Sequence, residues 1–298
     1  MDSLALMDVP VPAISDNEVL VRIKAIGVGI QDRWFVPRDV SSPYVIGIEA
    51  AGTIEKTGHA VTDYQPGDPV MFTSSMQPKG GVWAEFAAVR AAALIRIPEG
   101  LSFIQAAALP VPGSTALESM KLLDLKSGDS VFMAGASGAI GTLTIQLAKL
   151  LGCRVAASAS AKNHNYMRSL GAEKTVDYHD PDWVGQIREW RPGGVEAALA
   201  IQPDTGIDCL QVVKDGGRVV TVSGDHVPSE RGIHVAQVMA GPETKTKLAH
   251  LASEVASGHL HVEIEQVYPF ERGIEALEKT ETRHARGKLI LTLAQEAA

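Results

Sequence analysis

The pattern of hydrophobic and polar positions along the chain changes near residue 102. Before it, short apolar runs rich in β-branched residues alternate with period two and are separated by glycine- and proline-rich turns. Many short strands at close spacing are typical of a barrel-like or sandwich-like β unit. The clearest expected strands are Glu18–Ile26, Ile46–Ile54 and Pro69–Phe72.

After residue 102, apolar positions first recur at helical spacing, which predicts helices at Ser102–Leu109 and Ser114–Leu123. Strand and helix patterns then follow each other in strict succession, which predicts βαβ units and a parallel sheet. The expected strands are Ser130–Ala134, Arg154–Ala157, Thr175–Tyr178, Ala197–Ile201, Arg218–Val222 and Ile233–Met239, and the expected helices are Ile140–Leu151, Lys162–Leu170 and Trp183–Trp190.

The last part of the chain returns to a mixed pattern. We expect a helix at Lys245–Ser257, a strand pair around Val262–Val267 and Lys288–Leu293, and a helix between these strands at Phe270–Lys279. The sequence therefore predicts an α/β fold in which a doubly wound parallel sheet accompanies a β-rich part.

Composition and charge narrow the possible functions. The chain has 298 residues, 45% of them hydrophobic, and a net charge of −8, which disfavours nonspecific nucleic-acid binding. No apolar run reaches the length of a membrane helix, and the first residues do not resemble a signal peptide, so we expect a cytoplasmic protein with no membrane partner. Cys153 and Cys209 lie in apolar surroundings and are expected to be buried thiols.

The strongest chemical signal is a glycine-rich turn between an expected strand and an expected helix. Gly135, Gly138 and Gly141 have the spacing G-x-x-G-x-x-G. Such glycines permit a tight turn, a close approach of the backbone to a pyrophosphate, and close packing of helix on strand. The free N–H groups at the helix N-terminus favour phosphates. Because strand, turn and helix occur in this order, the motif predicts a dinucleotide site.

The end of the second expected strand indicates which dinucleotide binds. An NAD site places a carboxylate there to hold the ribose hydroxyls. This chain instead has Ser158, Ser160 and Lys162, which could bind a 2′-phosphate. We therefore expect NADPH as the cofactor. The alternative is that the two serines cap the following helix.

Several segments together resemble the medium-chain dehydrogenase/reductase superfamily, in its zinc-free quinone oxidoreductase (zeta-crystallin-like) branch. The resemblance implies a GroES-like catalytic domain formed by residues 1–103 and 243–298, around a Rossmann NADPH-binding domain at residues 104–242. The segments that carry it are Val19–Ile23, Ile46–Ile54, Gln65–Asp68, Gly80–Phe86, Ala106–Pro110, Thr115–Ala116, the glycine-rich turn, Leu170–Ala172, Val176–Tyr178 and Ala285–Leu291.

The resemblance also implies roles for single residues. The loop Ser137, Gly138, Ala139, Ile140 and Gly141 would contact the pyrophosphate, and Tyr178 would join Ser158, Ser160 and Lys162 around the 2′-phosphate. Thr115 would lie near the nicotinamide, Val222 and Gly224 along the cofactor, and Lys288 would reach the cofactor from the returning tail. The alternatives are that Tyr178 is a buried strand aromatic and that Lys288 is a surface lysine.

Zinc-dependent relatives resemble this chain too, but the positions of their metal ligands differ. Zinc alcohol dehydrogenases have Cys and His where this chain has Gly29 and Ile48, neither of which can bind zinc. The cysteine-rich structural zinc loop is missing as well, and histidines such as His59, His164, His179 and His226 are expected in loops or at the surface. We therefore expect no metal.

The expected catalytic pocket departs from the branch in two places. The branch usually has Asn at the position of Gly29 and often has Tyr at that of Trp34, whereas it shares Asp32. An indole N–H is a donor only, so a tyrosine proton donor is missing. We expect Asp32 to shape the pocket and Trp34 to form an aromatic wall for flat acceptors. The alternatives are that Asp32 caps a turn and that Trp34 packs in the core or at an interface.

The predicted function is the NADPH-dependent transfer of hydride to a quinone, enone or alkenal, whose polarised double bond needs no Lewis acid. One alternative is an enoyl-thioester reductase on the same scaffold, although Arg33 and Arg38 do not form a convincing basic patch for a carrier phosphate. The other is a non-catalytic NADPH-binding redox sensor. The last expected strand, Ile233–Met239, is an exposed edge that predicts a homodimer.

Overall fold

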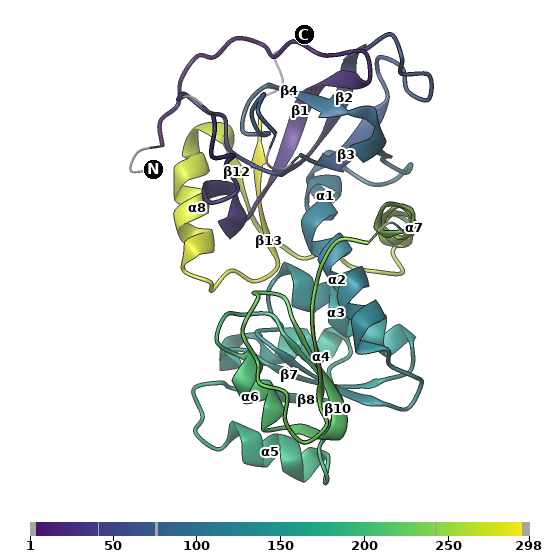
Figure 1. Cartoon of the computed structure of the whole chain (residues 1–298), viewed down its shortest axis with the longest axis vertical. Helices are drawn as coiled ribbons and strands as arrows, with labels where there is room; N and C mark the ends of the chain where they lie inside the picture. The colour runs from purple at the N-terminus through teal and green to yellow at the C-terminus, as the bar shows by residue number, and fades with distance from the viewer. Residues whose placement is uncertain (1–3, 41, 75–76, 242, 294–298) are drawn as a thin grey trace. The chain divides into compact units, whose positions relative to one another are not determined.

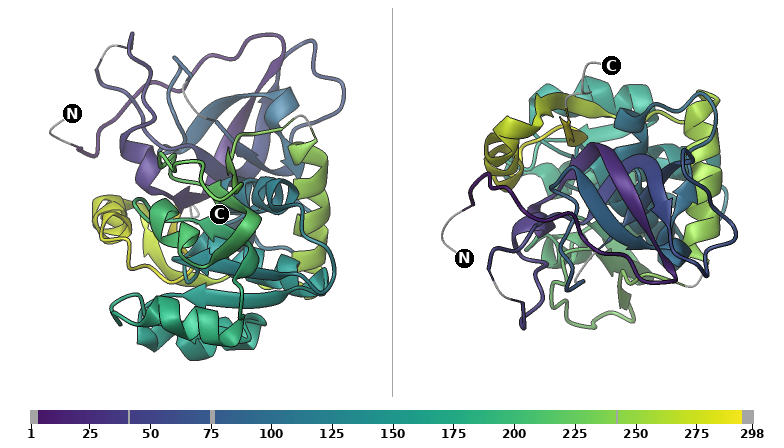
Figure 2. Two further views of the ribbon diagram at one scale, coloured as in Figure 1. Left: turned by 60° about the horizontal axis from the view of Figure 1, so that its bottom comes forward. Right: turned by 90° about the horizontal axis from the view of Figure 1, so that it is seen from above.

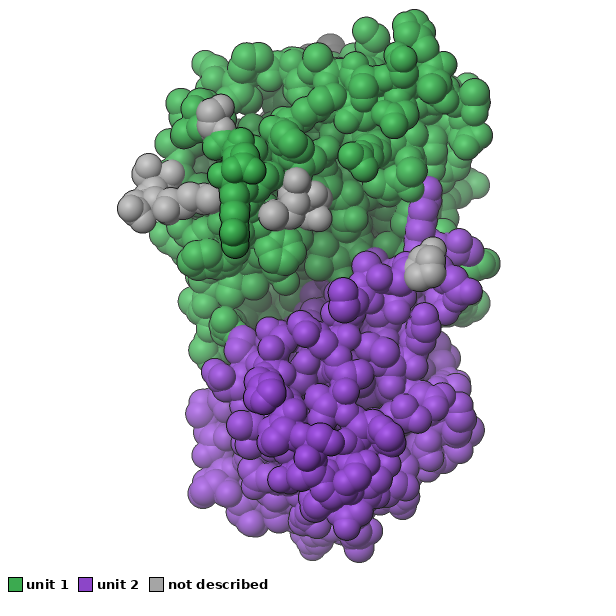
Figure 3. Space-filling model, in the orientation of Figure 1, with its two compact units in different colours: residues 1–111, 248–298 green, residues 112–247 purple. Residues whose placement is uncertain are grey.

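The computed structural model describes residues 4–40, 42–74, 77–241 and 243–293. The chain divides into two compact units, which we call unit 1 (residues 1–111 and 248–298) and unit 2 (residues 112–247) (Figure 3). Unit 2 thus begins eight residues later and ends five residues later than the sequence predicts. One reason is that helix α1 (Phe103–Ala107) packs on the sheet of unit 1. Within the described ranges, no helix is long and apolar enough to cross a membrane.

Unit 1 is built on a seven-stranded sheet. The strand order is β12-β13-β1-β2-β3-β5, and β4 also pairs with β1. The two strands expected in the tail do pair with each other, in parallel, and β13 then joins the antiparallel edge of β1. The strands are β1 (Glu18–Val28), β2 (Glu49–Thr57), β3 (Pro69–Thr73), β4 (Phe86–Arg90), β5 (Ile95–Arg96), β12 (Ile264–Pro269) and β13 (Lys288–Thr292).

Helix α8 (Gly273–Glu281) lies along β12 and β13 (Figures 1 and 2). The described chain also has helix α7 (Thr244–Ala256) and three short turns in unit 1. These turns are η1 (Ile30–Arg33), η2 (Ala91–Ala93) and η4 (Phe270–Arg272). Strand β2 begins at Glu49 and not at Ile46 as expected. The reason is that the backbone of residues 45–47 accepts hydrogen bonds from Gly81, Val82 and Trp83, in a loop.

Unit 2 has the predicted parallel sheet. Its strand order, β11-β10-β9-β6-β7-β8, is that of a doubly wound nucleotide-binding fold. The strands are β6 (Ser130–Ala134), β7 (Arg154–Ser158), β8 (Lys174–Val176), β9 (Val195–Ala200), β10 (Val213–Thr221) and β11 (His234–Gln237). The helices are α2 (Pro110–Leu123), α3 (Ala139–Leu150), η3 (Ala161–Asn163), α4 (His164–Leu170), α5 (Trp183–Trp190) and α6 (Gly206–Leu210). The predicted fold class is confirmed.

Both faces of the central strands of this sheet are covered, which is why β6 and β9 are almost entirely apolar. Along β6, Val131 and Met133 pack with α3 and α4, whereas Phe132 and Ala134 pack with α5 and α6. Cys153 and Cys209 are buried free thiols, one in each layer, as predicted. Helix α6 was not expected because five residues are too few to show a helical period.

Candidate active site

The glycine-rich turn follows β6 and leads into α3, as the motif predicts. Gly135 has φ +76°, which favours glycine, and a Cβ on Gly141 would lie 2.4 Å from the Ala136 Cα. Gly138 is the N-cap of α3, and the space where its Cβ would point is open. By helix geometry, the N–H groups of Ala139, Ile140 and Gly141 have no acceptor within the helix. The turn therefore offers free donors beside an open space, which fits a pyrophosphate.

We call Ser160 and Lys162, which follow β7, together with Tyr178 the polar corner; these are three of the four residues expected at a 2′-phosphate. The hydroxyl oxygens of Ser160 and Tyr178 are 3.5 Å apart, although these residues come from different segments. Lys162 is exposed, and its ammonium has no partner in the described part of the chain. Tyr178 is 44% exposed and lies just beyond β8, so the alternative of a buried strand aromatic is wrong.

Ser158 lies elsewhere than expected. It is buried, and its hydroxyl accepts a hydrogen bond from the Gly135 N–H at 3.3 Å, so it braces the glycine-rich turn from behind. Ser160 is the N-cap residue of the following turn η3, but its hydroxyl makes no capping bond, and the hydroxyl of Ser158 is bonded to Gly135, so neither serine caps the turn through its side chain. The positions of the two serines explain why their environments differ. Ser158 is the last residue of the buried strand β7, whereas Ser160 lies past its end.

The remaining expected cofactor residues of unit 2 lie on two further elements. Val222 directly follows β10, and its N–H donates to the Ala200 carbonyl at 2.9 Å. Gly224 lies in the loop two residues further on, at the carboxyl end of the parallel strand, where open α/β sheets bind ligands. Thr115 lies on α2 and is partly buried.

In unit 1, Asp32 is fully buried. Its Oδ2 accepts hydrogen bonds from the Gly29 N–H at 3.0 Å and from the Trp83 Nε1–H at 3.2 Å. Its Oδ1 is buried with no hydrogen-bond partner among the described residues. Burial raises the pKa of Asp32 to about 7. The bond to Gly29 shows that Asp32 does cap the turn η1, which was the alternative reading.

A buried ion pair lies beside Asp32. The Lys288 ammonium is bonded to Glu49 Oε1, and Glu49 Oε2 accepts the Val111 N–H at 2.7 Å. Both side chains are almost fully buried, so the alternative of a surface lysine is wrong. Burial raises the pKa of Glu49, and the charge of Lys288 opposes this. Through Val111, the pair fixes the backbone at the start of α2, the helix that carries Thr115.

The position of Gly29 faces this ion pair. A Cβ built on Gly29 would lie 3.7 Å from the Lys288 Nζ. Neither Gly29 nor Ile48 carries a ligating group, and no group of three or more His, Cys, Asp or Glu residues that could hold a metal occurs within the ranges that the structure describes. The charged group that faces Gly29 is the Lys288 ammonium.

Trp34 and Arg33 follow Asp32 and differ in environment. Trp34 is 69% exposed, so the alternative of core packing is wrong. Arg33 makes a bidentate pair with Glu281, from Nε to Oε1 at 2.6 Å and from Nη2 to Oε2 at 3.4 Å. Arg33 therefore ties η1 to the end of α8 and holds the backbone from which Trp34 projects.

Sequence reasoning gave no role to Glu49 or Trp83, although both lie in segments of the family resemblance. Two sequence features could have indicated them. Glu49 is a carboxylate inside the otherwise apolar run Ile46–Ile54, and Trp83 is an indole inside the glycine-rich loop Gly80–Phe86. Buried polar groups need partners, so such residues indicate contacts that the local pattern cannot name.

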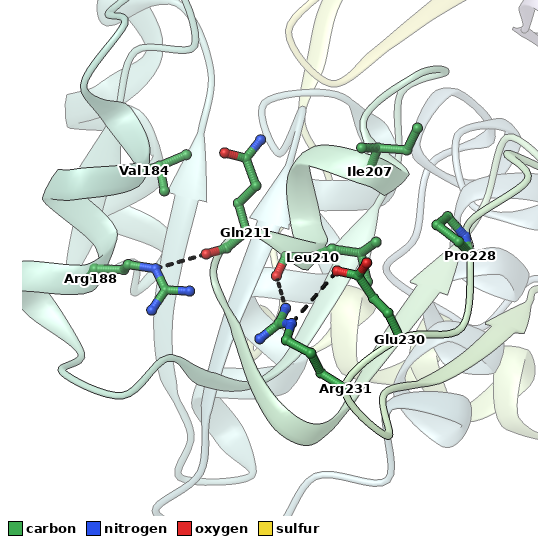
Figure 4. A pocket seen from close by; sticks show the side chains of 8 residues that line it. All are labelled: Val184, Arg188, Ile207, Leu210, Gln211, Pro228, Glu230 and Arg231. Carbon is green, nitrogen blue, oxygen red and sulfur yellow. Dashed lines mark hydrogen bonds and ion pairs between the residues drawn. The ribbon is translucent and has the colours of Figure 1, made fainter.

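Unit 2 also has a surface depression of about 500 Å³ that contains none of the expected site residues (Figure 4). Arg188 Nε donates to the Gln211 carbonyl at 2.9 Å, and Arg231 donates to the carbonyls of Leu210 and Val213. These bonds brace the backbone between α6 and β10. The depression is lined by Val184, Arg188, Ile207, Leu210, Gln211, Pro228, Glu230 and Arg231.

Comparisons with known proteins agree with this architecture. Residues 15–99 match the family model of the alcohol dehydrogenase GroES-like domain, and residues 170–291 match the zinc-binding dehydrogenase model. The quinone oxidoreductase of Sus scrofa is 28% identical over 307 residues, covering 96% of this chain and 92% of that protein. The chloroplastic NADPH-dependent alkenal/one oxidoreductase of Arabidopsis thaliana is 30% identical over 305 residues, covering 95% and 74%.

Among solved structures, the quinone oxidoreductase of Escherichia coli in complex with NADPH has a TM-score of 0.86 and 25% identity, covering 96% of this chain and 94% of that one. A GroES-like unit and a Rossmann unit with this glycine-rich turn define an oxidoreductase that uses a nicotinamide cofactor. The chain belongs to the medium-chain dehydrogenase/reductase superfamily, with quinone oxidoreductases among its relatives.

Proposed function

We propose that this protein transfers a hydride from NADPH to a quinone or another conjugated carbonyl compound, an enone or an alkenal, without a metal. The observation that carries the proposal is the polar corner after β7. There the hydroxyls of Ser160 and Tyr178 lie 3.5 Å apart, and the exposed ammonium of Lys162 has no partner in the described chain. Two hydroxyls and an ammonium suit a 2′-phosphate, which NADPH has and NADH lacks.

The other parts of unit 2 suit the rest of the dinucleotide. The open space at Gly138 and the free N–H groups of Ala139, Ile140 and Gly141 would hold the pyrophosphate. Val222 and Gly224, past the end of β10, would run along the cofactor, and Thr115 would lie near the nicotinamide. When bound, NADPH supplies the hydride; the protein positions it. In this proposal Ser158 supports the turn and Lys288 supports α2 through Glu49.

The proposed acceptor class follows from unit 1. Gly29 and Ile48 have no group that could ligate a Lewis acid, so an acceptor whose double bond is already polarised is the best match. The exposed indole of Trp34 offers a flat apolar surface to a flat acceptor, and Asp32 fixes the turn from which Trp34 projects. The names of the Sus scrofa and Arabidopsis thaliana relatives point to the same substrate classes.

The first test is a turnover assay. The purified chain is mixed with NADPH or NADH and a panel of quinones, enones and alkenals, with and without a chelator, and the loss of reduced cofactor is followed by absorbance. We expect faster oxidation of NADPH than of NADH, unchanged by the chelator. Lys162→Gln should raise the KM for NADPH about fivefold to tenfold, because one charge-assisted contact to the phosphate is lost.

The same assay separates the alternatives. Turnover of enoyl thioesters alone would identify an enoyl-thioester reductase. Tight NADPH binding without turnover of any acceptor would favour a non-catalytic redox sensor. Activity that requires added zinc would contradict the metal-free proposal.

We further propose that two copies associate through β11. This strand is the edge of the sheet of unit 2, and its backbone groups on one side have no neighbouring strand in the described chain. Val235 is 36% exposed and Met239, just beyond the strand, is 76% exposed. Exposed edges and apolar side chains favour pairing. Light scattering at micromolar concentration should give the mass of a dimer, and Val235→Lys should shift it to that of a monomer. A wild-type monomer would refute the pairing.

A further inference from the structure

A carboxylate lies directly behind the polar corner to which we assign the 2′-phosphate. Asp177 follows β8, and its Oδ2 accepts the Ala161 N–H at 3.0 Å, in the segment between Ser160 and Lys162. Its Oδ1 accepts the backbone N–H of His179 at 3.0 Å. The hydrogen bond from the His179 backbone is the main cause that holds the pKa of Asp177 below its usual range. Asp177 is therefore an anion at neutral pH.

An anion at this place opposes the binding of another anion. A 2′-phosphate carries a charge of about −1.5 to −2 near pH 7, and like charges at short range repel. The charge of Lys162 would then have to offset both the phosphate and Asp177. A second cation is therefore expected if the corner is to prefer a phosphate over a hydroxyl.

The imidazole of His179 lies where such a cation is needed. Its Nδ1 is 2.8 Å from Asp177 Oδ1, so the Nε2 is on the opposite side of the ring, away from that carboxylate. Its ring lies against the Tyr178 ring, with centroids 4.0 Å apart and an interplanar angle of 35°. The Tyr178 hydroxyl in turn lies 3.5 Å from that of Ser160. His179 thus contacts both the carboxylate and one wall of the polar corner.

We propose that the imidazole of His179 is a further specificity residue for the 2′-phosphate of NADPH. By pairing with Asp177 it offsets the charge of that carboxylate, so that the charge of Lys162 is left for the phosphate. This inference rests on the proposed function, because it presupposes a 2′-phosphate at this corner.

A second histidine lies on an adjacent element, and the test must separate it from His179. His164 is the first residue of α4, and its Nε2 lies 3.1 Å from the Ala159 carbonyl.

The experiment is titration calorimetry on the full chain with two probes, 2′,5′-ADP and 5′-AMP, at pH 6.5. In the wild type, 2′,5′-ADP should bind more tightly than 5′-AMP. In His179→Gln the ratio of the two affinities should fall about fivefold, since one exposed charge interaction is worth up to about 1 kcal/mol. His179→Lys should keep the ratio at least at the wild-type value.

Two control variants test whether the effect is local. His164→Gln removes the second histidine of this region. His259→Gln removes another exposed histidine–carboxylate pair, in which Nδ1 lies 3.0 Å from Glu254 Oε2 in unit 1. Both should keep the wild-type ratio.

Three results would overturn the inference. His179→Gln could keep the wild-type ratio, it could weaken both probes equally, which indicates a structural role only, or His164→Gln could lower the ratio as much as His179→Gln does. Failure of the proposed function gives a different result: a wild type that binds 5′-AMP as tightly as 2′,5′-ADP has no 2′-phosphate site, and then neither proposal holds.

Discussion

Replacing Lys288 by methionine is expected to lower the free energy of unfolding by about 3–5 kcal/mol at pH 8, because it leaves the buried Glu49 carboxylate without its partner. Methionine fills nearly the same volume, so little of this loss comes from a cavity. Chemical denaturation of the full chain measures it. The loss should shrink at pH 5, since burial already raises the pKa of Glu49 and protonation removes the uncompensated charge.

Two further variants make this expectation specific. The double variant Lys288→Met with Glu49→Gln carries no buried charge at the pair and should recover most of the lost stability. Lys79→Met breaks the ion pair between Lys79 and Glu18, in which the lysine side chain is 39% exposed. It should lower the free energy of unfolding by at most about 1 kcal/mol. A Lys288→Met protein as stable as the wild type at pH 8 would show that Glu49 does not depend on this ammonium.

The second large effect concerns Asp32. Its pKa is raised from 3.8 to about 7 in the folded chain, so between these values the folded state holds a proton that the unfolded state has lost. The free energy of unfolding therefore falls as the pH rises through this range, by about 1.4 kcal/mol per unit and by about 4 kcal/mol in total. Below pH 4 Asp32 causes no such loss of stability, and above pH 7 the loss is complete and no longer changes with pH.

Asp32→Asn removes this titration while its side-chain oxygen keeps accepting from the Gly29 and Trp83 N–H groups. Relative to the wild type, its free energy of unfolding should rise by about 4 kcal/mol between pH 4 and pH 8. Asp32→Ala leaves both N–H groups without an acceptor and should be less stable than Asp32→Asn at every pH, by about 1–3 kcal/mol for each group. Parallel stability curves for Asp32→Asn and the wild type would contradict an elevated pKa.

Most of the fold of unit 2 follows from local pattern. The strand at Ser130–Ala134 and the helix at Trp183–Trp190 have the bounds that the sequence predicts, because strand and helix periods are short-range properties. Short elements such as α6 and β5 were not predicted because they span too few residues to show a period. The division between the units also differed from the prediction, since α1 has the same local pattern whichever unit it packs against.

The sequence by itself determined the chemistry at the glycine-rich turn. Strand, glycines and helix are contiguous, so Gly135, Gly138 and Gly141 must adopt one arrangement whatever surrounds them. It also excluded zinc ligands at Gly29 and Ile48, because side-chain chemistry does not depend on the fold.

Only the tertiary structure decided what the isolated charges do. Glu49 and Lys288 are 239 residues apart in sequence, and Asp32 and Trp83 are 51 apart, yet both pairs are in contact. The tertiary structure likewise buries Ser158 against the Gly135 N–H and brings the hydroxyls of Ser160 and Tyr178 together. The physical reason is that burial and contact between distant residues arise from packing, so a lysine at position 288 looks the same in sequence whether it faces water or a buried carboxylate.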